Sequence, residues 1–141
     1  MREVGLVSCV KTKRGEPATP KELYTSPYFE KMRAYAEQYH DDWWIISAKH
    51  GLLGPDGDPI APYDETLSGA RVAKRREWAE MLDDQMEQKG LLSDDATLVL
   101  HADKDYYEEL LPLMENTGVT VKIPTKGLGI GKKQAWYKER L

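Results

Sequence analysis

The stretch from residue 43 to residue 48 reads Trp43-Trp44-Ile45-Ile46-Ser47-Ala48. It has the length of a strand, is rich in aromatic and β-branched residues, and shows no alternation of apolar and polar positions. Such a run is typical of a strand that is covered on both faces, as in parallel sheets. Because successive strand residues point to opposite sides, we expect Trp43 and Trp44 to pack on the two faces of the sheet, mainly in the core.

Strands and helices alternate outward from this run. Further strands are expected over residues 3–10, 96–100 and 119–123, the last at an edge because valine alternates there with polar residues. Helices are expected from Ser26-Pro27 to His40, from Ser68 to Gly90, from Lys104 to Asn116, and from the glycines near residue 130 to Leu141. This order predicts an α/β fold with a mainly parallel four-stranded or slightly larger sheet and helices on both faces.

Length and cysteine content narrow the class of protein. The 141 residues fit a single domain spanning 1–141. Cys9 is the one cysteine, which excludes an internal disulfide framework and a cysteine-rich zinc site. The apolar run at the N-terminus is short and is soon followed by Lys11, Lys13 and Arg14, unlike a signal peptide or a membrane span. We therefore expect a cytoplasmic protein with no membrane association, no metal and no cofactor, in an unknown oligomeric state.

The net charge argues against a globally basic surface that coats nucleic acid. It is -4 at pH 7, whereas tight phosphate binding needs concentrated lysine and arginine. A local basic groove is still compatible with the sequence, because basic residues gather at 11–14, 71–76 and 132–133. Runs of this kind are usually solvated faces, so they do not by themselves identify a nucleic-acid site.

Polar side chains follow every expected strand at the point where it ends. Ligands of open α/β sheets bind outside the carboxyl ends of the strands, so we expect these side chains to share one face and form the working site. They are Ser8, Cys9 and Lys11 after the first strand, Ser47, Lys49 and His50 after the second, His101 and Asp103 after the third, and Lys126, Gly127, Gly129 and Gly131 after the fourth.

Several of these residues are candidates for catalysis, each with a structural alternative. Cys9 is a candidate nucleophile, because a thiolate can form beside a base such as His50 or His101. A lone cysteine at a strand end can equally be a small buried apolar residue, and either histidine can be hydrogen-bonded and structural. Lys11 and Lys49 are alternative nucleophiles if burial near other cations lowers the pKa of one amine, although surface lysines are the common case.

The segment from Lys126 to Gly131 has the physical features of an anion-binding turn. Its three glycines let backbone amides approach an anion, and the positive end of the expected helix follows with Lys132-Lys133. The spacing G-x-G-x-G is neither a dinucleotide fingerprint nor a P-loop, and a tight strand-to-helix turn without a ligand is the alternative. We expect the amides around Gly127 to Gly131 to bind phosphate, and Lys126 is a further candidate nucleophile.

A proline-flanked loop carries a tyrosine and a carboxylate. It reads Pro59-Ile60-Ala61-Pro62-Tyr63-Asp64, and prolines restrict the backbone on either side of the functional pair. A tyrosine ring can stack on a base, and a carboxylate can accept hydrogen bonds from a sugar or a base. The alternative is a loop that packs over the sheet edge, with Tyr63 filling a gap.

Four segments together resemble a known group of proteins. Leu6 to Thr12, Ile46 to Leu53, Pro59 to Asp64 and Pro124 to Gly131 resemble a family of small uncharacterised bacterial, archaeal and phage domains, distantly similar to the peroxide-stress protein YaaA. The likeness spans nearly the whole chain, although this chain is much shorter than YaaA and has Cys9 where that family commonly has proline. The positions that match YaaA-like proteins are Ser8, Lys11, Gly51, Leu52, Pro62 and Tyr63.

The resemblance implies an association with DNA and oxidative DNA damage, and for the small relatives a neighbourhood of nucleobase modification or removal. We therefore expect an enzyme acting on a nucleotide or nucleic-acid base, at an N-glycosidic or base-linked position, with DNA as the favoured nucleic acid. Asp64 would stabilise or activate the reacting group, and His50 would transfer protons. Lys11 or Lys49 would be the nucleophile or a phosphate clamp. The alternatives are a non-catalytic DNA-binding module and a small-molecule sensor or scaffold protein.

Overall fold

Strands and helices alternate along the chain in a computed structural model that describes residues 2–141. In chain order they are β1 (Arg2–Ser8), α1 (Pro20–Leu23), α2 (Pro27–Tyr39), β2 (Asp42–Ser47), β3 (Gly51–Leu53), α3 (Val72–Gln88), β4 (Ala96–His101), α4 (Lys104–Tyr107), α5 (Leu111–Met114), β5 (Thr120–Lys122) and α6 (Ile130–Arg140). The strands form one five-stranded sheet in the order β3-β2-β1-β4-β5.

Parallel pairing brings the ends of the central strands to one edge of the sheet. β1 lies between β2 and β4 and is parallel to both, with Ser8 opposite Ile46 and Val7 opposite His101. β5 is parallel to β4, whereas β3 is antiparallel to β2. The predicted α/β fold with a mainly parallel sheet is confirmed, and the antiparallel β3 makes the sheet a mixed one.

The short strand β3 lies in a segment for which neither a strand nor a helix was predicted. It opens at Gly51 with a φ of 73°, which glycine adopts at little cost. A Cβ at this position would also collide with Oε1 of Gln85. That oxygen accepts a hydrogen bond from the Leu52 amide, and the Gln85 amide group donates to the carbonyl of His50. A glycine is therefore required here for both the backbone conformation and the contact with α3.

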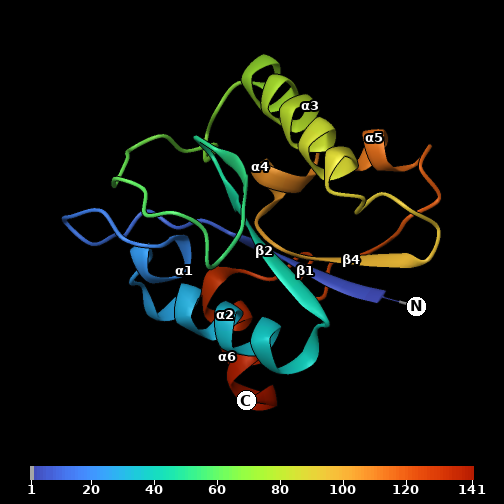
Figure 1. Cartoon of the computed structure of the whole chain (residues 1–141). Coiled ribbons are helices and arrows are strands. Elements are labelled where there is room, and N and C mark those ends of the chain that lie inside the picture. The colour runs from blue at the N-terminus through green and yellow to red at the C-terminus, as the bar shows by residue number, and fades with distance from the viewer. Residues whose placement is uncertain (1) are drawn as a thin grey trace.

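Helices pack their apolar faces against the strands. Figure 1 shows α3, α4 and α5 on one side of the strands and α2 and α6 on the other. The start of α2 is as predicted, because the Ser26 hydroxyl accepts a hydrogen bond from the Phe29 amide. Trp43 and Trp44 are only partly buried but pack against the core. None of the helices formed by residues 2–141 combines the length and the apolar character required to span a membrane.

Two predicted helices have different bounds in the structure. The helix expected over residues 104–116 is split into α4 and α5. Pro112 has no amide hydrogen and its ring crowds the carbonyl four residues earlier, which disfavours an unbroken helix through this position. The helix expected from Ser68 begins only at Val72, because Gly69 has a φ of 73° and is not helical. The short helix α1 likewise lies in a segment for which no helix was predicted.

Candidate functional site

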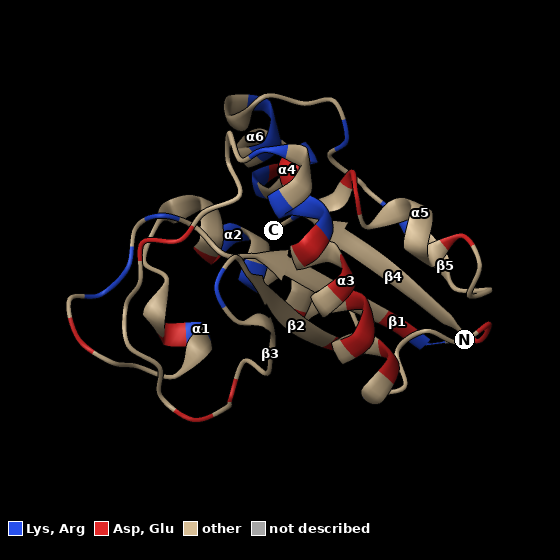
Figure 2. Ribbon diagram, turned by 90° about the horizontal axis from the view of Figure 1, so that it is seen from above, with Lys and Arg blue, Asp and Glu red and all other residues tan. Residues whose placement is uncertain are grey.

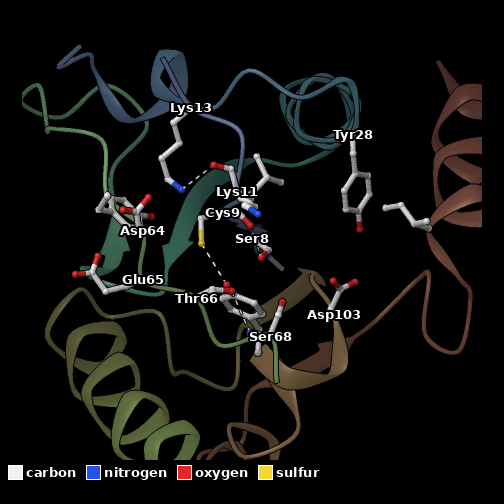
Figure 3. A pocket seen from close by; sticks show the side chains of 14 residues that line it. Ser8, Cys9, Lys11, Lys13, Tyr28, Asp64, Glu65, Thr66, Ser68 and Asp103 are labelled. Carbon is white, nitrogen blue, oxygen red and sulfur yellow. Dashed lines mark hydrogen bonds between the residues drawn. The ribbon is translucent and has the colours of Figure 1, made fainter. Parts of the chain in front are cut away.

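A cavity of about 620 Å³ opens at the edge where β1 and β4 end. Its walls come from the segment after β1, the start of α2, residues 63–68, the segment after β4 and the start of α6. In Figure 3, Cys9 lies in the middle, Lys13 and Asp64 lie to one side, and Tyr28 and Asp103 lie to the other. The volume falls within the range of small-molecule sites.

The cavity unites candidates that are far apart in the sequence. The side chains proposed from the sequence that line it are Ser8, Cys9, Lys11, Tyr63 and Asp64, together with Asp103. Parallel pairing of β1 and β4 explains why residues 8–11 meet Asp103. The proline-flanked loop reaches them because Ile60 and Ala18 exchange backbone hydrogen bonds of 2.9 and 3.1 Å. The sequence prediction of a polar site at this edge therefore has a matching cavity.

Cys9 is held by donors on two sides. Its amide continues the ladder of β1 by donating to the carbonyl of Ile46 at 3.0 Å. Its sulfur accepts a hydrogen bond from the Ala48 amide at 3.4 Å and lies 3.6 Å from the Tyr106 hydroxyl. Because burial raises the pKa of Tyr106, that hydroxyl keeps its proton and can donate to the sulfur. Both contacts fix the position of the sulfur at the cavity.

Tyr63 is fixed in the cavity wall through its hydroxyl. The hydroxyl lies 2.5 Å from that of Tyr24 and 2.6 Å from that of Ser47. The Ser47 oxygen also accepts from the amides of Lys49 and His50, at 3.2 and 3.1 Å. Burial raises the pKa of Tyr63 and that of Tyr24, so both hydroxyls stay protonated. Ser47 therefore positions Tyr63 from within the core.

Lys13 is a cavity residue that the sequence analysis recorded only as part of a basic run. Its ammonium lies 4.4 Å from the centroid of the Tyr63 ring and donates to the carbonyl of Lys11 at 3.2 Å. Partial burial lowers its pKa, and the nearby carboxylates of Asp64 and Glu65 oppose that shift. The signal that could have identified it is its spacing, because residues two apart in an extended segment point the same way.

Carboxylates face the cavity from two directions. Asp64 and Glu65 lie on one side and Asp103 on the other (Figure 3). Asp103 is held by an ion pair with the ammonium of Lys133, whose side chain is only 8% exposed. Asp64 and Glu65 are exposed at the mouth. A ligand in this space would therefore meet an acidic group at either end.

Other predicted site residues lie elsewhere. Within residues 2–141, the cavity lining does not include Lys49, His50 or Lys126. His50 packs edge-on against the Tyr63 ring at 5.5 Å between centroids, and burial and the charge of Lys49 lower its pKa. Lys49 and Lys126 are exposed. These three side chains therefore form no part of the described cavity lining, and only His50 contacts one of its residues.

The glycine turn approaches the cavity at one residue. Gly127 has a φ of 82° and Gly129 caps the start of α6, while Gly131 lies inside that helix. In the part of the chain that the structure describes, Ile130 is the member of this turn that lines the cavity. The turn is therefore a neighbour of the cavity rather than its floor.

His101 belongs to a hydrogen-bonded row that is buried except at Glu3, on the side of the sheet that α2 and α6 cover. We call this row, made of Glu3, His40, His101 and Tyr137, the histidine row. The Glu3 carboxylate lies 2.7 Å from Nδ1 of His40, the two Nε2 atoms are 2.8 Å apart, and Nδ1 of His101 lies 2.7 Å from the Tyr137 hydroxyl. Burial and the neighbouring His40 lower the pKa of His101 to about 3, so His101 is neutral. It lines no part of the described cavity.

The basic run on α3 is largely engaged by acidic neighbours. Figure 2 shows basic residues at the start of α3 and acidic residues along the rest of it. Arg75 lies 3.8 Å from Asp105 and 3.6 Å from Glu108, and Arg76 lies 3.2 Å from Glu109. These surface pairs contribute little stability, but they reduce the positive potential available to a phosphate. This helix therefore gives little support to a basic groove.

A metal site does not emerge from the geometry. Across residues 2–141, no three or more histidine, cysteine, aspartate or glutamate side chains are grouped so that they could hold a metal ion. The chemistry available at the cavity is that of a thiol, amines, hydroxyls and carboxylates.

Comparisons with known proteins give a family without an assigned activity. The family of unknown function DUF6884 matches residues 4–139. The uncharacterized protein YfjM of Bacillus subtilis (strain 168) is 31% identical over 112 residues, which are 75% of this chain and 73% of that protein. No solved structure matches. The expectation of a small uncharacterised family is confirmed, and no link to YaaA is shown.

Proposed function

The chain belongs to DUF6884, a family of unknown function. We propose that it is an enzyme acting on a nucleotide or nucleic-acid base at the bond between base and sugar. The observation that carries the proposal is the cavity of about 620 Å³ with carboxylates at both ends and an amine and a tyrosine ring in its wall. These are the groups that stabilise a cationic sugar and hold a flat ring.

Asp64 has the central role in this proposal. When the bond between the base and the sugar breaks, positive charge develops on the sugar, and a carboxylate beside it stabilises that charge. Asp103, held by Lys133 on the far side of the cavity, would accept hydrogen bonds from the base. Lys11 is exposed at the cavity, where it can contact a phosphate. Because Lys49 and His50 do not line the described cavity, the proposal gives them no direct role.

The resemblance to YaaA-like proteins supports a nucleic-acid substrate in this proposal, with DNA favoured over RNA. A non-catalytic DNA-binding module is the rival. Its affinity would fall steeply as salt concentration rises, because binding would come from phosphate contacts, and it would form no product.

A mass-spectrometric screen of the purified protein against modified nucleosides, nucleotides and damaged oligonucleotides tests the proposal. We expect a released base with the wild type. Asp64→Asn should lower release by about 100-fold, since one carboxylate beside the developing charge is lost. Asp58→Asn is the matched control, because Asp58 is an exposed residue of the same long loop and lies outside the described cavity lining. Salt-sensitive DNA binding without any product would contradict the enzyme and favour the rival.

A further inference from the structure

We infer that Lys13 is a covalent nucleophile of this cavity, which attacks the sugar carbon bonded to the base and forms an imine with the opened sugar. The inference rests on the proposed function and deepens it, because it gives the substrate class: a sugar whose anomeric carbon can become an aldehyde. A lysine amine acts in this way when its lone pair is available and its position is fixed.

The backbone of Lys13 is fixed against a neighbouring segment. Lys13 and Tyr24 form an antiparallel bridge. On either side of it, the Arg14 amide donates to the carbonyl of Leu23 at 2.9 Å, and the Thr25 amide donates to that of Thr12 at 3.1 Å. This small ladder keeps Lys13 at the wall of the cavity, whereas Lys11 stands exposed nearby.

The side chain is fixed as well. The nitrogen lies over the ring of Tyr63, and the Tyr63 hydroxyl is itself held by Tyr24 and Ser47. One hydrogen bond, to the carbonyl of Lys11, orients the amine from the other side. The nitrogen is therefore positioned without being enclosed in an ion pair, in contrast to Lys133, whose ammonium is paired with Asp103.

The surroundings provide both the neutral amine and a proton acceptor. Partial burial lowers the pKa of Lys13 from the ordinary value for lysine, which increases the fraction that carries a lone pair at neutral pH. Asp64 and Glu65 lie close enough to affect that same pKa. Either carboxylate can accept the proton that the nitrogen loses when it attacks.

With a nucleoside as substrate, the proposed reaction has two bond-breaking steps. The amine forms a bond to the anomeric carbon while the base leaves with the electron pair of its own bond and takes up one proton. The bond from that carbon to the ring oxygen then breaks, and the oxygen takes the electron pair and the second proton from the nitrogen. The product is an imine, which water hydrolyses to an aldehyde and free Lys13.

Reductive trapping tests the inference. The full chain is mixed with an oligonucleotide that carries an aldehydic abasic site, borohydride is added to reduce any imine to a stable amine, and the cross-linked peptide is found by mass spectrometry. We expect the cross-link at Lys13. Lys13→Arg keeps the positive charge but has no nucleophilic amine at neutral pH, and it should lower trapping about 50-fold. Lys138→Arg, an exposed site on α6 outside the described lining, should trap as the wild type does.

Two outcomes would overturn the inference: a cross-link that maps to another lysine, or undiminished trapping by Lys13→Arg with an unchanged melting temperature. Base release in the screen described above separates this result from the proposed function. Base released by the wild type with no trapped adduct would refute the role of Lys13 and leave the enzyme standing. A Lys13 adduct with no base released from any nucleoside or oligonucleotide would support the reactive amine and refute base removal.

Discussion

The cavity and the histidine row both contain carboxylate and tyrosine side chains, but only in the cavity do polar groups face space that a ligand could fill. His101 and Asp103 are two residues apart at the end of β4, yet His101 is completely buried and the Asp103 side chain is 57% exposed. In the row, each imidazole nitrogen has a hydrogen-bonding partner within 2.8 Å. In the cavity, carboxylates and hydroxyls face open space. A polar residue at a strand end therefore indicates a ligand site only when its hydrogen bonds are not already satisfied within the fold.

The largest predicted effect tests whether the histidine row is structural. A Cβ at Gly5 would collide with Cδ2 of His40, so Gly5→Ala should displace that ring and break its hydrogen bonds. We expect the free energy of unfolding to fall by about 3 kcal/mol, from overpacking together with lost hydrogen bonds. Urea unfolding followed by circular dichroism measures it.

Gly15→Ala is the matched control for this prediction, because no heavy atom lies within 4 Å of a Cβ built there. It should change stability by less than about 0.5 kcal/mol. Equal effects of the two substitutions would show that the row is not tightly packed.

The second prediction concerns pH. His101→Phe removes a partner from both His40 and Tyr137, which should cost about 2 kcal/mol of unfolding free energy near pH 8. The pKa of His101 is about 3 in the folded chain against an ordinary value of 6.5. Its neutral form therefore contributes stability that is present above pH 6.5 and is lost as pH falls toward 3, at up to about 1.4 kcal/mol per pH unit.

The phenylalanine variant lacks this loss, so its deficit relative to the wild type should shrink between about pH 6.5 and pH 4. Urea titrations at a series of pH values give the two curves. A deficit that stays constant with pH would mean that His101 titrates normally in the folded chain, and the contrast with the cavity would fail.

The smallest predicted effect tests whether the glycine turn contributes to ligand binding at the cavity. The backbone of Gly129 suits any residue and its Cβ would meet no atom within 4 Å, so Gly129→Val should leave the melting temperature nearly unchanged. Crowding of the amides at the start of α6 should weaken nucleotide binding by about fivefold, the upper range for one exposed helix end. Unchanged affinity by calorimetry would make the turn purely structural.

Most of the sheet could be predicted from the sequence, because buried parallel strands are continuous apolar runs. The runs at β1, β2 and β4 are of this kind, and Ser26-Pro27 marks the start of α2. β3 could not be predicted, since three residues carry no periodicity and their pairing depends on Gln85 from a distant helix. The break within residues 104–116 could have been inferred from Pro112.

The candidate site was predictable as a place more than as a set of residues. The rule for strand ends predicted Ser8, Cys9 and Lys11 at one edge, and the proline-flanked loop suggested Tyr63 and Asp64; all five line the cavity. That rule cannot tell which side chains turn inward, because burial depends on the helices that cover each face. The burial of His101 under α2 and α6 leaves no mark in the local sequence, whereas Lys13 could have been proposed from its spacing to Lys11 but not its approach to the Tyr63 ring.

The histidine row also has a direction. A carboxylate at Glu3 can only accept, so His40 donates from Nδ1. With a single ring proton on His40, its Nε2 accepts from His101, which accepts in turn from Tyr137. Every donor in the row thus points toward the half-exposed end. One proton added to His40 makes both of its nitrogens donors, and each bond beyond it must then reverse. A proton gained by His40 at the end of α2 would thus reverse the hydrogen bonds as far as Tyr137 on α6 by moving hydrogen atoms alone.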